Sequence, residues 1–165
     1  MYLIPNIPGS YVIMGELPGN VYVDVGAFGH FEMKTGRYFY CGNARGSGGL
    51  QARIMRHFKD EKKNFWHFDY VRPHLNLLCV WWCDARVSEC DFCRHIGRVN
   101  NASHPILGFG ASDCENDCPS HLVYAATSAT WQAIFSTLQE KLTDYSEIES
   151  YGNLLESSKN ITGAA

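Results

Sequence analysis

The sequence predicts an α/β fold in a single domain, and three observations lead to that prediction. The chain has 165 residues, of which 45% are hydrophobic, so it can bury one sizeable core. Short runs of β-branched and aromatic residues, separated by Gly and Pro, fill its N-terminal third. Apolar residues at helical spacing follow between residues 47 and 60. We expect one domain over residues 1–143 and an acidic, partly disordered extension over residues 144–165.

The first strands are expected at residues 10–17, 20–25 and 36–42, where tight connections containing Gly and Pro divide the apolar runs. This part of the chain should form a β meander. The first helix is expected at residues 47–60. Its apolar stripe consists of three residues at four-residue intervals, namely Leu50, Ile54 and Phe58.

The rest of the domain alternates between strands and helices. An aromatic-rich connection at residues 62–70 leads into a buried strand at 75–83. Ser88 can cap the next helix, which should run to about residue 98, and an acidic first turn favours that start. A turn-rich loop at residues 100–119, a last strand at 121–126 and a last helix at 128–143 complete the expected order.

The cysteine content and the start of the chain bear on the cellular compartment. Pro5 and Pro8 interrupt the first residues, which carry no basic side chain, and the longest apolar run covers only residues 77–83. We expect neither an export signal nor a membrane span. The seven cysteines are odd in number and irregularly spaced, which suits reduced thiols or metal ligands better than a disulfide framework. A cytoplasmic location is therefore expected.

The charge is unevenly distributed along the chain. The net charge of −3 argues against a nucleic-acid partner, but residues 34–63 alone carry a net charge of +6. Such a basic block attracts a phosphate backbone, so DNA or RNA is an expected partner. The simpler alternative is a solvated helix and loop. Five basic residues are the expected phosphate contacts: Arg45, Arg56, Lys59, Lys62 and Lys63.

Two polar residues of the first expected helix are candidates for a binding site. Arg53 and His57 lie four residues apart, so they share one helix face, which is rotated away from the apolar stripe. From there both can meet a ligand that lies over the edge of the sheet. An Arg and a His on a helix are, however, more often exposed to solvent than functional.

Three segments, GSY at residues 9–11, YCG at 40–42 and LxxRxxxH at 50–57, resemble in order the signature of the GIY-YIG nucleases. Further segments resemble a prokaryotic branch of that superfamily whose members are sometimes fused to endonuclease III-like DNA repair enzymes. These segments are WHFDY, GFGASDC and CPSHLVY. The resemblance implies a small, mainly antiparallel central sheet flanked by helices. It also implies an extra β-hairpin, inserted between Tyr11 and Tyr40.

The resemblance further implies metal-dependent hydrolysis of nucleic-acid phosphodiesters, with a possible role in DNA repair or processing. The catalytic residues carried over from it are Tyr11, Tyr40, Arg53, His57 and Glu89. His67 is a further candidate, for handling a proton or contacting phosphate. Glu89 would bind Mg²⁺ or Mn²⁺. Tyr11 would orient or deprotonate the attacking water, provided that Arg53, His57 and the metal lower the pKa of its phenol.

Each of these residues also has an ordinary structural explanation. The tyrosines can be plain strand aromatics. Glu89 can be a carboxylate that favours a helix N-terminus. His67 can be a half-buried side chain whose ring nitrogens have ordinary hydrogen-bond partners.

The cysteines form a second candidate site. Cys114, Cys118 and His121 offer three soft ligands at close spacing, and Cys90 or Cys93, on the next expected helix, can supply a fourth, a set that suits Zn²⁺. Such a site requires the loop at residues 108–121 to pack against the start of the second long helix. The spacing matches no standard zinc knuckle, and the same residues can be packing residues. Two rivals to a nuclease therefore stay open: a non-catalytic nucleic-acid-binding module and a zinc-stabilised structural or partner-binding domain.

Overall fold

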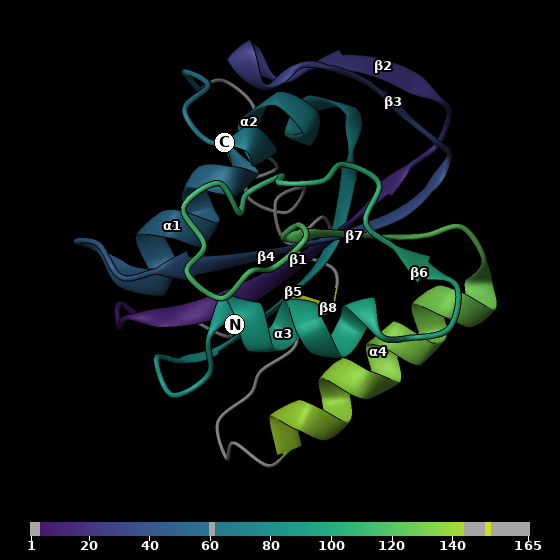
Figure 1. Ribbon diagram of the computed structural model, residues 1–165. Coiled ribbons are helices and arrows are strands. Elements are labelled where there is room, and N and C mark those ends of the chain that lie inside the picture. The colour runs from purple at the N-terminus through teal and green to yellow at the C-terminus, as the bar shows by residue number, and fades with distance from the viewer. Residues whose placement is uncertain (1–3, 60–61, 144–150, 153–165) are drawn as a thin grey trace, which may run out of the picture.

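The computed structural model of the protein describes residues 4–59, 62–143 and 151–152. It contains a six-stranded sheet in the order β6-β7-β4-β1-β5-β8, with helices on both faces (Figure 1). Every neighbouring pair of strands in this sheet is antiparallel. The expected α/β class, with a small antiparallel sheet between helices, is confirmed.

Strand β1 occupies the centre of the sheet. Its neighbours are β4 and β5, and three short strands extend the two edges. The bounds are β1 Gly9–Leu17, β4 Gly36–Ala44, β5 Asn76–Asp84, β6 Ala102–Ser103, β7 Leu122–Ala125 and β8 Tyr151–Gly152. Because β1 is hydrogen-bonded on both sides and covered on both faces, nearly all its side chains are buried.

The β-hairpin expected between Tyr11 and Tyr40 is present. Strands β2 (Val21–Asp24) and β3 (His30–Met33) pair with each other as a separate two-stranded sheet. A 3-10 turn at Gly26–Phe28 connects them. Val23 and Met33 are buried in the main core, so the hairpin packs onto the domain as an integral part of it.

Four α-helices cover the sheet: α1 Gly49–Phe58, α2 His67–Val71, α3 Glu89–Gly97 and α4 Ser128–Thr143. Helices α1 and α2 lie with the hairpin on one face, and α3 and α4 lie on the other (Figure 1). Alternation along β1 divides the core accordingly. Tyr11 and Ile13 join the cluster under α1, whereas Val12 and Met14 pack with residues of α3 and α4.

Helix α2 was not expected, because residues 62–70 were predicted to be a connection. Asp69 explains its formation locally. One oxygen of its carboxylate accepts the backbone N–H groups of Phe65 and Trp66, each at 3.0 Å, so two donors at the helix start are satisfied. A further 3-10 turn at Arg72–His74 follows.

The predicted acidic extension at residues 144–165 lies outside the described residues, apart from the two that form β8. None of the helices in the described ranges combines the length and the apolar character needed to cross a lipid bilayer.

Candidate active site and metal centre

A cavity of about 560 Å³ opens where β1, β4, α1 and the start of α3 meet the loop before β7. All six residues predicted to be catalytic line it: Tyr11, Tyr40, Arg53, His57, His67 and Glu89. Residues that are far apart in the sequence are therefore brought together around one concave space. We call this space the cleft.

Tyr11 and His57 form a buried pair at the base of the cleft. Each is 1% exposed, and 2.7 Å separates the Tyr11 hydroxyl from Nε2 of His57. Burial, together with the smaller effect of the nearby Lys62 ammonium, lowers the pKa of His57 to about 3. The imidazole is therefore neutral. The Asp69 carboxylate lies on the Nδ1 side of the ring and favours the tautomer with its proton on Nδ1; in that tautomer Nε2 accepts a hydrogen bond that the Tyr11 hydroxyl donates.

The other ring nitrogen of His57 then carries the proton. This Nδ1 atom is buried and has no hydrogen-bond partner within the described part of the chain. The nearest carboxylate oxygen belongs to Asp69, at 3.8 Å. Asp69 therefore lies on the side of the imidazole that is away from Tyr11, at a distance from Nδ1 that is too long for a hydrogen bond.

The protein groups around the phenols of the cleft do not lower the pKa of either phenol below its ordinary value. Burial raises the pKa of Tyr11 well above its ordinary value, Tyr40 raises it further, and Arg53 offsets only part of this. Burial likewise raises the pKa of Tyr40. Tyr11 can act as a base only if Arg53, His57 and a metal together lower its pKa, and the protein groups alone do not meet that condition, since desolvation outweighs the charge of Arg53. Tyr11 remains protonated at neutral pH.

Gly42 creates the space for the Tyr11 ring. The two residues are paired across β1 and β4, and a Cβ atom at Gly42 would lie 2.4 Å from the ring. Tyr40, two residues earlier, stacks on Phe68 with ring centroids 4.4 Å apart and an interplanar angle of 9°. The YCG segment thus places one aromatic ring in the cleft and leaves room for the second.

Arg53 is held against the wall of the cleft by two contacts. Its guanidinium lies over the indole of Trp66, 4.1 Å from the ring centroid. Its Nε donates a hydrogen bond to the backbone carbonyl of Asn43, at 3.3 Å. A cation that is fixed in this way needs little reorganisation to meet an anionic ligand.

Glu89, the first residue of α3, presents a carboxylate to the cleft. Oε1 accepts a hydrogen bond from the Asn43 side chain at 2.8 Å. Oε2 is buried and has no hydrogen-bond partner among the residues that the structure describes; Nη2 of Arg45 lies 3.9 Å away. A buried carboxylate oxygen without a partner is costly unless a cation or a water satisfies it. Oε2 therefore has the chemistry of a ligand for a hard divalent cation.

The sequence analysis did not single out Asn43, which lines the cleft, or Asp69, which lies beside His57. Asp69 is 1% exposed. Burial alone would raise its pKa, but hydrogen bonds from Arg56, from two backbone amides and from Lys62 hold the pKa well below its ordinary range. A signal for Asn43 was its position directly after the YCG segment. Asp69 stood inside the recognised WHFDY segment, where only the histidine was singled out.

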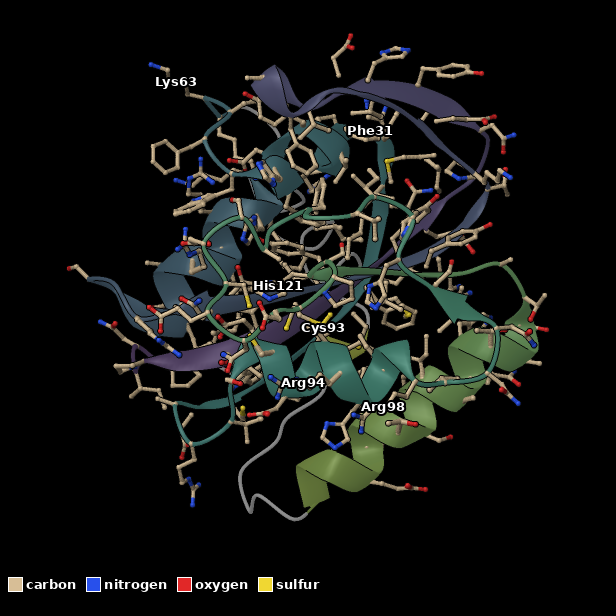
Figure 2. The ribbon with its side chains drawn as sticks, viewed as in Figure 1. Phe31, Lys63, Cys93, Arg94, Arg98 and His121 are labelled. Atoms are coloured by element: carbon tan, nitrogen blue, oxygen red, sulfur yellow. The ribbon has the colours of Figure 1, made fainter. Side chains whose placement is uncertain are left out.

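The basic block is only partly available to a nucleic acid. Arg56 binds both oxygens of Asp69, at 3.0 and 2.9 Å, and the Lys62 ammonium lies 3.0 Å from the same carboxylate. The expectation that Arg56 and Lys62 contact phosphate is therefore corrected, because both are turned toward a buried anion. Three of the five predicted contacts remain exposed: Arg45, Lys59 and Lys63. Lys63 projects from the periphery of the molecule (Figure 2).

His67 connects α2 to the loop on the opposite side of the cleft. Its Nδ1 accepts the backbone N–H of Gly110 at 2.9 Å, and its ring stacks on Phe28 with centroids 4.5 Å apart. Burial lowers its pKa, so the ring is neutral. With Nδ1 engaged by the backbone, His67 positions the loop.

The predicted cysteine and histidine ligands meet beside Glu89. The ligand atoms of Cys90, Cys114, Cys118 and His121 all lie within 4.8 Å of one another. Cys90 Sγ is 3.4 Å from Cys114 Sγ and 3.6 Å from His121 Nε2. Tetrahedral zinc with bonds of about 2.3 Å places sulfur ligands roughly 3.8 Å apart, close to these separations. The set could hold a metal ion such as zinc, and we call it the Cys₃His centre.

The Cys₃His centre joins the loop before β7 to the start of α3, as the sequence predicted. His121 lies between that loop and α3, with Cys93 nearby on the helix (Figure 2). Cys93 has a separate partner, the carbonyl of Ser120 at 2.8 Å. Burial opposes ionisation of Cys114, but the amides of Cys118 and Asn116 bring its pKa below the ordinary value. One member of the set is therefore disposed to bind metal as a thiolate.

The depressed pKa of His57 leads to a pH prediction. Between pH 6.5 and about 3, the unfolded chain protonates this histidine and the folded chain does not, so the free energy of unfolding falls as the pH drops below 6.5. We expect His57→Gln to remove up to about 1 kcal/mol per pH unit of that loss. Urea denaturation of both proteins between about pH 7 and pH 5 measures it. Equal pH dependence in the two proteins would contradict the buried neutral imidazole.

The fold and these side chains define a mixed α/β protein with a polar cleft beside a candidate Cys₃His metal centre. The chain belongs to the family described as the domain of unknown function DUF123, whose family model matches residues 10–144. No curated protein and no solved structure gives a significant match.

Proposed function

We propose that the protein is a metal-dependent endonuclease of the GIY-YIG type, which hydrolyses phosphodiester bonds of DNA or RNA. One observation carries the proposal. The Tyr11–His57 pair, Arg53 and Glu89, one of whose oxygens has no hydrogen-bond partner among the described residues, line the same cleft. An acceptor for a proton, a fixed cation and an anionic ligand for a metal are the three components that such a hydrolysis needs.

Arg53 is the group that would stabilise negative charge on the phosphate. Its contacts with Trp66 and the Asn43 carbonyl hold the guanidinium before any substrate arrives. Charge that develops on the phosphate oxygens in the transition state would thus meet a cation that is already in place. Arg45, whose side chain is 70% exposed at the cleft, would contribute to attraction of the substrate.

Tyr11 and His57 would handle the proton of the attacking water. Because Tyr11 remains protonated, we assign it a relay role: its oxygen accepts the proton from water while its own proton passes to Nε2 of His57. The Asp69 carboxylate, 3.8 Å from Nδ1, would stabilise the imidazolium that results. As the bond from the water oxygen to phosphorus forms, the bond from phosphorus to the leaving sugar oxygen breaks, and that oxygen takes a proton from solvent water. The imidazolium then returns its extra proton to solvent through Tyr11, so the net reaction consumes one water and releases an alcohol and a phosphomonoester.

Glu89 would hold Mg²⁺ or Mn²⁺ through Oε2, with Asn43 fixing the other oxygen. A divalent ion bound there would supply a Lewis acid for the phosphate oxygens. A small number of protein ligands is enough for Mg²⁺, because this ion keeps several waters and binds substrate phosphates directly.

Zinc in the Cys₃His centre is a separate part of the proposal, and the ligand geometry favours it. Its role would be structural, because all four ligands come from the protein. Thiolate ligands require reduced cysteines, which agrees with a cytoplasmic location. A zinc-stabilised partner-binding domain remains the second candidate function, since the same geometry would support it without catalysis.

The nuclease proposal is tested with the full chain, purified without chelator, on labelled single-stranded, duplex, flapped and branched DNA and on matching RNA. We expect at least one of these substrates to be cleaved, and we expect the cleavage to require added Mg²⁺ or Mn²⁺. If nothing is cut under either metal while nucleic acid still binds, the non-catalytic binding module becomes the better description.

Binding to nucleic acid should depend strongly on salt because it rests on the exposed members of the basic block. The slope of log K against log salt should be about 0.9 per phosphate neutralised on duplex DNA. Lys63→Glu, at an exposed position, should reduce that slope by roughly one such unit or more without loss of stability. Fluorescence anisotropy between about 50 and 200 mM salt measures it. An affinity that is independent of salt would argue against a phosphate backbone as the partner.

A further inference from the structure

An aromatic side chain stands exposed at the mouth of the cleft. Phe65 is 73% exposed and lines the cavity. Its ring meets Trp66 edge to face, with centroids 4.7 Å apart and an interplanar angle of 76°. Large exposed apolar side chains are unremarkable when scattered, but this one adjoins a cleft that also contains Arg45 and Arg53.

The backbone that carries Phe65 is fixed from behind. The N–H groups of Phe65 and Trp66 both donate to the buried Asp69 carboxylate, which is itself held by Arg56 and Lys62. One face of the Trp66 indole is occupied by the Arg53 guanidinium. The Phe65 ring is thus presented to solvent by a rigid support, so little backbone order has to be gained when a ligand stacks on it.

We infer that Phe65 is a stacking platform for an unpaired nucleobase, and that the substrate therefore carries at least one unpaired nucleotide next to the phosphate held by Arg53. This inference rests on the proposed function and names its substrate class. Aromatic rings beside cationic groups are how proteins hold single-stranded nucleic acids, with the base on the ring and the phosphate on the cation. Within a continuous duplex both faces of each base are already stacked on neighbouring bases, which leaves no face for Phe65.

The test measures binding of the full, metal-loaded chain to three labelled hairpins in the presence of Ca²⁺. One hairpin ends in a short single-stranded tail, one has the same tail without bases, and one is blunt; DNA and RNA versions are both used. The variants are Phe65→Ala, Phe65→Trp, which keeps an aromatic ring, and Leu107→Ala. Leu107 is the matched control, because it is also 73% exposed and is absent from the lining of the cleft.

Wild-type protein should bind the tailed hairpin about 5- to 150-fold more tightly than the hairpin with the abasic tail, the range expected for stacking of one base. Phe65→Ala should lose this preference and keep its affinity for the abasic tail. Phe65→Trp and Leu107→Ala should retain the preference.

Equal binding of all three hairpins, or a preference that survives Phe65→Ala, would overturn the stacking inference and leave the nuclease proposal standing. If none of the hairpins binds at low salt, the stacking inference and the nuclease proposal both fail. The two failures are therefore distinguishable.

Discussion

Replacing Glu89 with Gln is expected to slow phosphodiester cleavage by at least about 10²- to 10³-fold, the usual cost of losing one preorganised electrostatic contact. The amide keeps the size of the side chain and can still accept the hydrogen bond from Asn43 through its carbonyl oxygen. What it loses is the negative charge on the buried oxygen that has no hydrogen-bond partner within the described residues. Added Mn²⁺ should not restore the rate, because the missing group is the ligand itself.

The thermal midpoint of this variant should stay within a few degrees of the wild type, because no core volume is removed. Two controls separate catalysis from folding. Glu115→Gln removes a negative charge from an exposed position on the cleft wall and should leave the rate unchanged. Cys79→Ala should lower stability through a small cavity and spare turnover in the folded fraction. Full activity in Glu89→Gln would show that the metal is held elsewhere.

Removing zinc is expected to have the second largest effect, on stability. The Cys₃His centre connects two segments, the loop before β7 and the start of α3. Binding of zinc to the folded state alone should contribute at least about 3 kcal/mol, on the order of 10 °C in Tm. Cys114→Ser should show the same loss without chelator, because a hydroxyl replaces a thiolate at the half-exposed ligand.

Elemental analysis provides the independent measurement, with about one zinc expected per chain. Cys93→Ala is the control, since this thiol donates a hydrogen bond to the Ser120 carbonyl and lies outside the ligand set. It should lower stability modestly and leave the zinc content intact. Less than about 0.2 zinc per chain, together with freely reactive thiols, would show that these cysteines are packing residues.

The residues that could be predicted are those whose types form a local pattern. Periodicity located the long strands and helices, and the ordered segments placed Tyr11, Tyr40, Arg53 and Glu89, which the fold brings to one cleft. The ligand set of the Cys₃His centre could also be predicted, because its close spacing limits the ways in which those donors can meet.

What could not be predicted depends on burial and on pairs that are distant in sequence. The pKa of Tyr11 is dominated by desolvation, which spacing does not reveal, so the sequence could name a lowered pKa only as a condition for Tyr11 to act as a base. Arg56 and Lys62 counted as basic residues in a basic block, yet the position of Asp69 inside the fold determines where they point. Asp69 itself creates α2 through hydrogen bonds to the backbone, an effect that apolar periodicity cannot register.

The position of β1 between β4 and β5 has a consequence for the order in which the protein folds. Pairing with β4 joins segments of the N-terminal third, whereas pairing with β5 joins residues such as Gly9 and Asp84, which are far apart in the chain. Contacts of such long range form slowly, because the intervening chain must first lose its freedom. Before that step β1 has an open, apolar edge, which is prone to association with other chains. Glu89 begins α3, the helix that follows β5, so the cleft is completed only when this slow pairing has occurred. A fragment that contains the whole tyrosine and arginine signature would have neither a covered edge nor a site.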